Sequence, residues 1–537
     1  MSDADEATSA AGSSLRLFAV VFPVVALVMV FMLRDAVFGR AIYEVGDFAA
    51  NALQIDKAKH FSELVGNYSR FDFHHPGPAF FYVYAVGEAV FHDLVSLTAA
   101  PGNAHLLAGT LLQAAFLAAG IVAVAVMLPR RRISFVVVAC AIALVHLHLV
   151  GDPQMSIWPP DVLLLPFFAF LASSAAMATG RSGFLPVAVV SGAFLVHGHT
   201  GQALFVVPIF VVTWMLLARA IRRERGPGTR LFLETTGRRH LVALILVAPF
   251  VLTLVLDALR GPASNVGRIL AVGHPSVHPL DAIAFYILSF MTDDAPAGVI
   301  DVTPADQLTF AWGHLVRLVI VAGLIAGPVL VIWSENRRRQ GRSPLARDLR
   351  TYWLVLFLAA ALGVVWVSFQ PGELFGFNSV FLWGLLYAAV LPAAMLVVDR
   401  LEDRWARAAV VAAGVVVGVV VLQPASLVKS DSTAGRDIHA SLPRLLATTD
   451  PGRPIFLDMA RLPTWAVAAG LALDLDRSGR RFVVTEGGPS LILGYDHTMR
   501  PDGSDRPIRW TLVDPRETPD YLFRFSEELA LGEVVSR

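Results

Sequence analysis

The 537-residue chain is poor in charge and in cysteine. Only 16% of its residues are Asp, Glu, Lys or Arg, whereas ordinary soluble domains carry roughly 25%. Its one cysteine, Cys140, lies in an apolar run, which excludes a disulfide framework and a thiolate metal site. Lys and Arg total 43, and so do Asp and Glu, so the zero net charge gives no overall attraction to nucleic acid. These absences favour an integral membrane protein.

Long apolar runs are abundant instead. A helix that crosses a bilayer needs about 20 mostly apolar residues, and eleven stretches reach or approach this length: 16–33, 104–128, 133–151, 158–179, 184–198, 200–218, 240–259, 310–333, 352–369, 378–398 and 407–424. The fifth is short and is predicted to be a broken helix. The first has no small-residue cleavage site after it, so we interpret it as an uncleaved anchor and not as a signal peptide.

Arginine clusters predict the orientation of these spans, because positive loops stay on the cytoplasmic side of a membrane. With eleven spans, all four clusters fall on one side: they lie at 130–132, 219–230, 337–350 and 400–407. The N-terminus is then cytoplasmic. Three segments are predicted to lie outside: 34–103, 260–309 and 425–537.

The first external loop is predicted to hold two interfacial helices. Pro78–Leu97 is apolar enough to resemble a span, but Glu88, His92 and Asp93 interrupt it. A full span here would also turn the Arg130 cluster to the outer side, against the rule that positive loops stay inside. Asn51–Leu64 has one apolar and one charged face, as an amphipathic helix does. Residues 65–77 join the two helices.

The tail has a mixed polar and apolar composition that differs from everything before it. Residues 453–459 and 481–485 read as strands and 464–475 as a helix, which is a βαβ-like alternation. The chain is therefore predicted to divide into a transmembrane domain, residues 1–428, and a small extracytoplasmic α/β domain, residues 429–537. Because the tail has no Gly-rich phosphate loop and no nucleophile elbow, we interpret it as a structural or docking unit.

Acidic, basic and imidazole side chains concentrate in the first external loop. Glu44 and Asp47 follow the first span, and about 30 residues later comes His74-His75-Pro76-Gly77-Pro78, followed by the aromatic run Phe80-Phe81-Tyr82. Long loops on a compact membrane body usually carry function. We expect these groups to converge at the depth of the lipid headgroups.

These motifs resemble the GT-C glycosyltransferases, which are polytopic enzymes that use polyprenyl-phosphate sugars. The nearest branches are the protein O-mannosyltransferase-like group, the lipid A aminoarabinose transferases and the rhizobial core-oligosaccharide transferases. In these enzymes an acidic motif opens the first external loop and a Pro-rich turn with His or Lys follows. Here the acidic motif is Gly46-Asp47, and Gly77 separates two prolines that are adjacent in many members. The resemblance implies a GT-C-like bundle followed by a soluble domain.

The resemblance also implies an activity. The protein would be an inverting glycosyltransferase that moves a sugar from an undecaprenyl- or decaprenyl-phosphate carrier to a lipid, glycan or protein acceptor outside a bacterial inner membrane. Such transfer needs a base for the acceptor and positive groups for the phosphate. Asp47 is the candidate base, although Asp could equally cap the helix that follows it. Glu44 is the second candidate, and a solvated interfacial charge is the alternative role for it.

Several residues are candidates for binding substrate. Arg70 lies beside the His-Pro turn and could hold a phosphate through two parallel hydrogen bonds. Lys57 and Lys59 could do the same or could be the wet face of a helix, and Arg268 could face headgroups. His74, His75, His199 and Asp152 complete the set of candidates. His75 and His199 could also hold a divalent metal ion, whereas direct hydrogen bonding to substrate is the competing interpretation.

Two other classes of function compete with an enzyme. A transporter or lipid flippase would place charged residues at mid-membrane, whereas here the polar residues collect at one face. A non-catalytic envelope scaffold would use the tail to recruit other proteins, and Asp47 would then be dispensable.

Overall fold

A computed structural model of the chain describes most of the membrane-embedded part and much of the tail. The described residues are 3–128, 131–149, 151–225, 229–261, 264–272, 277, 279–290, 330, 333–334, 337–338, 344–370, 374–422, 432–447, 449–458, 465–499, 507–513, 523–524 and 530–534.

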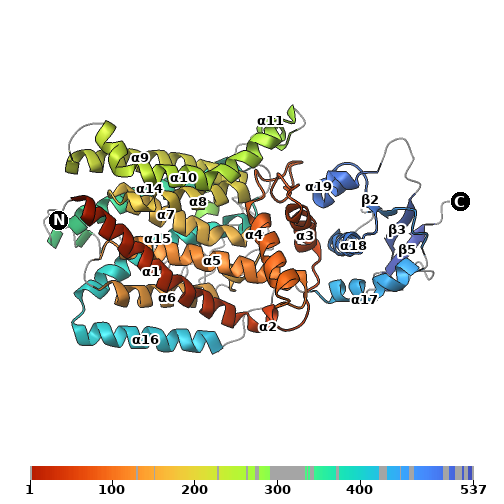
Figure 1. Cartoon of the computed structure of the whole chain (residues 1–537), viewed down its shortest axis with the longest axis horizontal. Coiled ribbons are helices and arrows are strands. Elements are labelled where there is room, and N and C mark those ends of the chain that lie inside the picture. Colours follow the sequence, from red (N-terminus) through yellow and green to blue (C-terminus); the bar gives the residue numbers. More distant parts are fainter. Residues whose placement is uncertain are drawn as a thin grey trace.

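Long apolar helices form a bundle that makes up the larger part of the molecule (Figure 1). In the described residues, nine helical stretches are long and apolar enough to cross a membrane, and Ser182–Gly198 is a shorter tenth. They match ten of the eleven predicted spans, and of the predicted span 310–333 the described residues include only 330 and 333. The chain is therefore a multi-pass membrane protein. Its helices are α1 (Asp3–Met32), α5 (Pro101–Ala125), α6 (Arg132–Leu149), α7 (Leu164–Ala178), α8 (Leu185–Gly198), α9 (Ala203–Arg225), α10 (Thr229–Ala258), α14 (Pro344–Ser368), α15 (Trp383–Arg400) and α16 (Asp403–Leu422).

Helix α7 is the centre of this bundle. All residues from Leu164 to Ala178 are buried, and the helix contacts α5, α8, α9, α14 and α15. Close packing depends on small residues, because a Cβ added at Gly120 of α5 would lie 2.3 Å from the ring of Phe168 on α7. By contrast, α10 and α16 expose most of their apolar residues, as expected of helices that face lipid.

The short connections at one end of the bundle hold basic residues. Arg131 donates to Asp403 at 2.9 Å, and Arg181 pairs with Asp348 at the same distance. The N-terminus lies at this end, and the first loop and the tail lie at the other (Figure 1). The structure thus agrees with the predicted grouping of the arginine clusters on one side.

The first loop folds into short helices at the opposite end. They are α2 (Arg34–Val37), α3 (Gly46–Lys59) and α4 (Ala79–Gly87), which continues as the π-helix η1 (Glu88–Leu94). Helix α3 begins five residues earlier than predicted, after Val45, which is extended. Alanine-rich sequence, Asp47 in the first turn and lysines in the last turn all favour this helix. It contacts α4 on one side and α18 of the tail on the other.

The tail folds into a small α/β unit. The predicted βαβ alternation is confirmed, because β1 (Ile455–Asp458) and β2 (Phe482–Val483) pair in parallel with α18 (Trp465–Arg477) between them in sequence. The sheet continues through strands that the sequence analysis did not predict, in the order β2-β1-β3-β5-β4. The remaining elements are α17 (Thr433–Ala447), α19 (Gly488–Leu493), β3 (Ile508–Val513), β4 (Phe523–Arg524) and β5 (Ala530–Val534).

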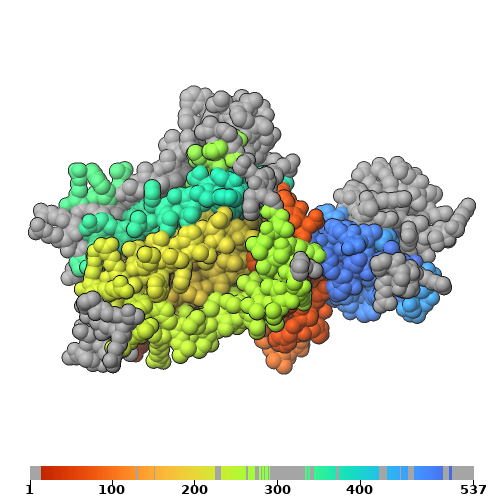
Figure 2. All heavy atoms as spheres, turned by 90° about the horizontal axis from the view of Figure 1, so that it is seen from above, coloured from red at the N-terminus to blue at the C-terminus, as the bar shows by residue number. Residues whose placement is uncertain are grey.

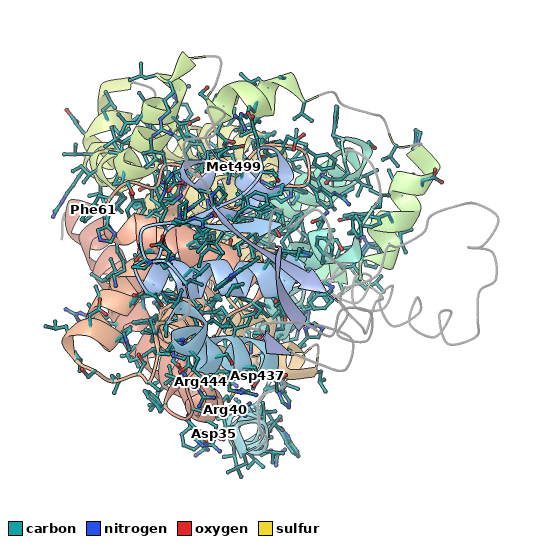
Figure 3. The ribbon with its side chains drawn as sticks, turned by 90° about the vertical axis from the view of Figure 1, so that its right-hand side faces the viewer. Asp35, Arg40, Phe61, Asp437, Arg444 and Met499 are labelled. Atoms are coloured by element: carbon teal, nitrogen blue, oxygen red, sulfur yellow. The ribbon has the colours of Figure 1, made fainter. Side chains whose placement is uncertain are left out.

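Helix α17 covers the tail with its polar face outward. Ile438, Leu442 and Leu445 are buried in the core, while Asp437 and Arg444 point outward and lie at the same edge as Asp35 and Arg40 of the first loop (Figure 3). Ala49, Ala52 and Leu53 of α3 join the same core. Seen from above, the first loop lies between the bundle and the tail (Figure 2).

Candidate functional site

A cavity of about 720 Å³ lies at the end of the bundle beneath the first loop. This volume is in the range of sites for small molecules and cofactors. Residues from six stretches line it: 47–75 of the loop, 158–163, 198–204 around the turn between α8 and α9, 269–272, 369–370 and 377–378. Segments distant in sequence therefore build one site.

The cavity has a polar part and an apolar part. Polar and charged side chains come mainly from the first loop and from 199–200, whereas Leu163, Leu204, Ile269, Leu270 and Phe369 contribute apolar surface. Leu270 is 81% exposed and Phe369 is 48% exposed, so the apolar part continues onto the outer surface of the bundle. A ligand with a charged head and a long apolar chain fits such a site.

Asp47 lines the cavity from the first turn of α3. It does not cap the helix, because the N-cap residue is Val45 and no side-chain cap bond forms. Instead, the hydroxyl of Tyr68 donates to Oδ1, and the indole Nε1 of Trp158 donates to Oδ2 at 2.8 Å. Burial, followed by the charge of Asp47, raises the pKa of Tyr68, so its hydroxyl stays protonated as a donor. Both oxygens of Asp47 accept, as those of an ionised carboxylate do.

Arg70 reaches the same cavity from the connection between α3 and α4. Its guanidinium carbon lies 4.0 Å from the ring centroid of Phe375 and 5.1 Å from that of Phe71. Stacking between aromatic rings restrains the side chain while a guanidinium still presents N–H groups at its edge. The site therefore combines a carboxylate and a restrained cation.

His75 and His199 meet at the cavity wall, with ring centroids 4.4 Å apart. Nδ1 of His75 accepts the N–H of Thr200 at 3.3 Å, and Nδ1 of His199 accepts the N–H of Gly201 at 3.0 Å. Burial lowers the pKa of His75 well below its usual value and that of His199 to about 4. Both rings are therefore neutral at pH 7 and carry their proton on Nε2, as donors.

This imidazole pair does not complete a metal site. Among the residues that the structure describes, no three His, Cys, Asp or Glu side chains gather closely enough to hold a metal ion. Both Nδ1 atoms already accept backbone hydrogen bonds. Among the described residues this pair thus has no third ligand beside it, and metal binding by His75 and His199 stays a prediction.

Glu44, the second candidate base, lies outside the cavity lining. Its side chain is buried and accepts hydrogen bonds from Arg477 of α18 at 3.1 and 3.5 Å. Nδ1 of His105 lies 3.5 Å from its Oε1. Burial alone would raise the pKa of Glu44, but Arg477 and His105 lower it to about 2. Its carboxylate is thus committed to an ion pair with the tail.

The two lysines of α3 also have partners outside the cavity lining. Lys57 pairs with Asp496 of the tail. Lys59 donates to Glu88 at 2.6 Å and to Asp93 at 2.9 Å in η1. These pairs join α3 to its neighbours.

The remaining candidates lie around the site. His74 exchanges backbone hydrogen bonds with the side chain of Asn265, and burial lowers its pKa to about 4. Arg268 donates to the hydroxyl of Tyr495 and covers its ring. Asp152 is buried and contacts His148 at 3.0 Å. The cavity thus brings together Asp47, Arg70, His75 and His199, but not Glu44, Lys57, Lys59, His74, Asp152 or Arg268.

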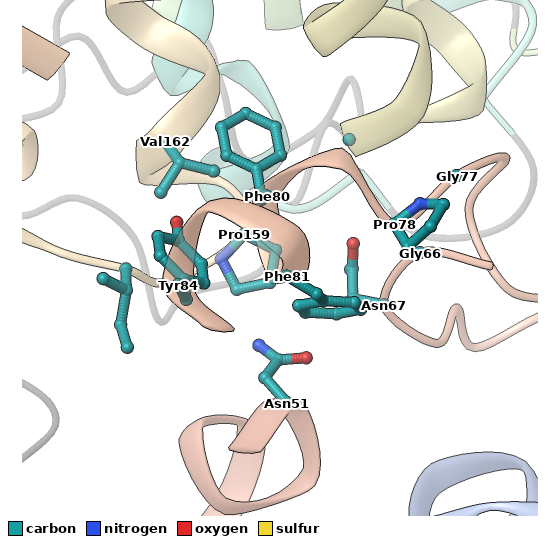
Figure 4. A pocket seen from close by; sticks show the side chains of 12 residues that line it. Asn51, Gly66, Asn67, Gly77, Pro78, Phe80, Phe81, Tyr84, Pro159 and Val162 are labelled. Carbon is teal, nitrogen blue, oxygen red and sulfur yellow. The ribbon is translucent and has the colours of Figure 1, made fainter. Parts of the chain in front are cut away.

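A small side pocket of about 20 Å³ adjoins the cavity, with room for about one water molecule. Asn51 of α3 and Asn67 of the loop point toward it beside Phe81 (Figure 4). Gly77 forms part of its wall. A Cβ added at Gly77 would lie 2.1 Å from Nδ1 of His197 on α8, so a larger residue does not fit there. The glycine between the two prolines is therefore required by the close approach of α8.

Several residues of the site were not predicted from the sequence. Trp158, which donates to Asp47, was not among the candidates. Tyr68 and Phe375 were not candidates at all. A Pro-Pro pair after Trp158 gives a weak signal of a rigid turn, but no sequence pattern links 158 or 375 to residue 47.

No protein-family model matches this sequence, and no curated protein matches it. Solved structures do share its fold. ArnT from Cupriavidus metallidurans in the apo state is similar with a TM-score of 0.55 and 13% identity, over 96% of this chain and 98% of that chain. ArnT from the same organism bound to undecaprenyl phosphate is similar with a TM-score of 0.51 and 14% identity, over 97% of this chain and 98% of that chain.

These similarities define the class of fold. The bundle, the first-loop helices and the tail together share the fold of the ArnT structures, as expected from the resemblance of the sequence motifs. At 13% and 14% identity the likeness concerns the fold. The likeness does not show the reaction, which we infer from the residues of the cavity.

Proposed function

We propose that this protein is a membrane glycosyltransferase that moves a sugar from a polyprenyl-phosphate carrier to an acceptor. The observation that carries the proposal is the amphipathic cavity, in which Asp47 and Arg70 share one polar end beside a wall of apolar side chains. A polyprenyl-phosphate sugar has the matching parts: a sugar, a charged phosphate and an apolar chain. One of the two similar ArnT structures has undecaprenyl phosphate bound, which supports a carrier of this chemical class.

Each group in the cavity has a role in this proposal. Asp47 is the general base, held by Tyr68 and Trp158. Arg70 offsets the charge of the phosphate, and the Nε2–H groups of His75 and His199 supply two neutral donors. The apolar wall, continued by Leu270 to the outer surface, receives the lipid chain.

The proposed step is a single displacement. The acceptor hydroxyl oxygen attacks the anomeric carbon of the sugar, and its proton passes to Asp47. The bond from that carbon to the phosphate oxygen breaks, and the carrier phosphate leaves with the electron pair. A single displacement inverts the anomeric carbon. The lipid phosphate is the leaving group, so no nucleotide is required.

The proposed location is a bacterial inner membrane, with the N-terminus in the cytoplasm and the cavity on the outer face. The positive-inside rule supports this orientation, because the arginine-rich connections lie at the end of the bundle opposite the cavity. The acceptor would then be an envelope lipid, glycan or protein.

A transfer assay with Asp47→Asn tests the proposal. Purified protein in lipid is given a radiolabelled polyprenyl-phosphate sugar and envelope extract. Asparagine keeps the shape but cannot take the proton, so transfer is expected to fall by about 10²- to 10⁴-fold. Asp56→Asn on the same helix is the matched control, because Asp56 is half exposed beside His60.

Two results would contradict the proposal. Equal transfer by wild type and Asp47→Asn would remove Asp47 as the base. Movement of the carrier across the membrane without any transfer of its sugar would instead identify a flippase.

A further inference from the structure

We propose that the tail is a positioning device for Asp47, acting through the ion pair between the buried Glu44 and the partly exposed Arg477. This inference rests on the proposed function, since it concerns the placement of the proposed base. Glu44 and Arg477 are then positioning residues and not catalytic ones. The tail, for which the sequence indicated only a structural or docking role, acquires a specific one.

Glu44 lies at the entry to α3. Only Val45 separates it from the first residue of α3, so it fixes the point at which the chain enters the helix that carries Asp47. Its side chain is 1% exposed, and both its oxygens face Arg477. Breaking a buried pair leaves an uncompensated charge, which is strongly unfavourable. The tail therefore restrains the start of α3.

The side chains that contact Glu44 also reach the other end of α3. His105 of α5 lies between Glu44 and Glu88, with its Nε2 2.7 Å from Glu88 Oε2. Glu88 in turn accepts from Lys59, the last residue of α3, at 2.6 Å. A chain of polar contacts thus runs from Arg477 of the tail through Glu44, His105 and Glu88 to Lys59, and it reaches both ends of α3.

The tail also packs against the length of α3. Ala49, Ala52 and Leu53 of α3 share a core with α18. The approach is close enough that a Cβ added at Gly470 of α18 would lie 2.9 Å from Val45. Ring packing between Trp465 and Tyr68, at 6.3 Å between centroids, extends the support to the donor that holds Asp47.

These contacts predict what loss of the pair does. Glu44 lies outside the cavity lining, so substrate contacts stay intact while α3 loses one restraint. A shift of a catalytic group by about 1 Å can cost about 10²-fold in rate. We therefore expect kcat to fall by a larger factor than the factor by which KM for donor changes.

The experiment compares Arg477→Gln, Arg477→Lys and a control in the full-length protein. Arg480→Gln is the control because Arg480 lies three residues after Arg477, the last residue of α18, and donates to the backbone carbonyl of Asp450 within the tail. One readout is the transfer assay, resolved into kcat and the KM for donor. The other is hydrogen exchange of residues 46–59, measured without substrate on monodisperse protein.

Arg477→Gln is expected to lower kcat by roughly 10- to 100-fold while KM changes less than about 3-fold. Exchange in 46–59 should become at least about 10-fold faster, with Pro101–Ala125 still protected. Arg477→Lys keeps the charge but loses one hydrogen bond, so it should recover part of both values. Arg480→Gln should match wild type.

Unchanged exchange of residues 46–59 in Arg477→Gln would overturn the inference. A kcat for Arg477→Gln that is no lower than the kcat of Arg480→Gln would overturn it too. If wild type transfers no sugar, the proposed function fails. The exchange result still decides whether the tail restrains α3.

Discussion

At the scale of single residues, the site depends on side chains whose positions are fixed by neighbours. Tyr68 and Trp158 hold the carboxylate of Asp47, and the rings of Phe71 and Phe375 restrain the guanidinium of Arg70. Restrained groups lose little freedom when they meet a charged ligand. The carboxylate and the cation therefore have distinct tasks within one cavity.

Replacing Arg70 should weaken the interaction with the carrier phosphate. Arg70→Ala removes a charge-assisted contact that is worth about 1.5–3 kcal/mol, so kcat/KM for donor should fall by about 10- to 150-fold. Arg70→Lys keeps the charge and should lose less. Arg34→Ala, which removes an arginine stacked on Phe31 of α1, serves as the control. Equal kcat/KM for Arg70→Ala and wild type would exclude Arg70 from phosphate binding.

Gly77 should tolerate no side chain. A methyl group there would overlap His197, so Gly77→Ala should destabilise the protein by about 1–3 kcal/mol. A thermal unfolding scan in detergent measures this. Gly414→Ala is the matched control, because nothing lies within 4 Å of a Cβ added at that helical position. A melting temperature for Gly77→Ala as high as that of Gly414→Ala would show that the two segments do not meet.

At the scale of elements, the sequence predicted most of the helices and few of their partners. Hydropathy located ten spans of the described residues, because burial in lipid requires a continuous apolar run. The start of α3 was missed by five residues, since Val45 and Gly46 carry no capping side chain. Strands β3, β4 and β5 were missed because their pairing is set by distant residues.

Sequence patterns predicted mainly those site residues that lie in one loop of the chain. Asp47, Arg70 and His75 lie in one loop whose composition pointed to them, and His199 stood out as part of a histidine pair. Glu44 was the second candidate base because it lies in the acidic motif at the start of the first loop. Its partner Arg477 lies 433 positions away, and no periodic pattern connects residues so far apart. Long-range pairing therefore decided which of the two acidic residues faces the cavity.

The contact between α3 and α18 should depend on pH through Glu44. Its pKa is lowered from 4.5 to about 2 in the folded state, so its stabilising contribution is present above pH 4.5 and is lost as the pH falls toward 2. The contribution is on the order of 3 kcal/mol. Unfolding measured between pH 6 and 3 should therefore show a steep loss of stability.

Glu44→Gln should be less stable than wild type at pH 6 but should depend less on pH. Glu402→Gln is the control because Glu402 is 68% exposed at the opposite end of the bundle. Parallel pH profiles for wild type and Glu44→Gln would contradict the depressed pKa.

At the scale of the whole molecule, the zero net charge is the sum of two unlike ends. Arginine-rich connections occupy one end of the bundle, and the cavity with its carboxylate and imidazoles occupies the other. A transporter would place its polar site near mid-membrane. A cavity confined to one end fits chemistry at one face of the membrane.

Labelling of single cysteines tests this topology. In a Cys140→Ser background, Ser432→Cys should react with a membrane-impermeant maleimide on spheroplasts, because the tail lies at the cavity end. Glu402→Cys at the opposite end should react only in inverted vesicles. The reverse pattern would place the cavity in the cytoplasm.

The central claim is that the cavity binds a polyprenyl-phosphate sugar, and a structure with that donor bound tests it most directly. The account predicts the phosphate beside Arg70 and the histidine pair, the sugar toward Asp47, and the lipid chain along Leu204, Ile269 and Leu270. A donor bound elsewhere on the bundle at saturating concentration, with this cavity lacking it, would contradict the account.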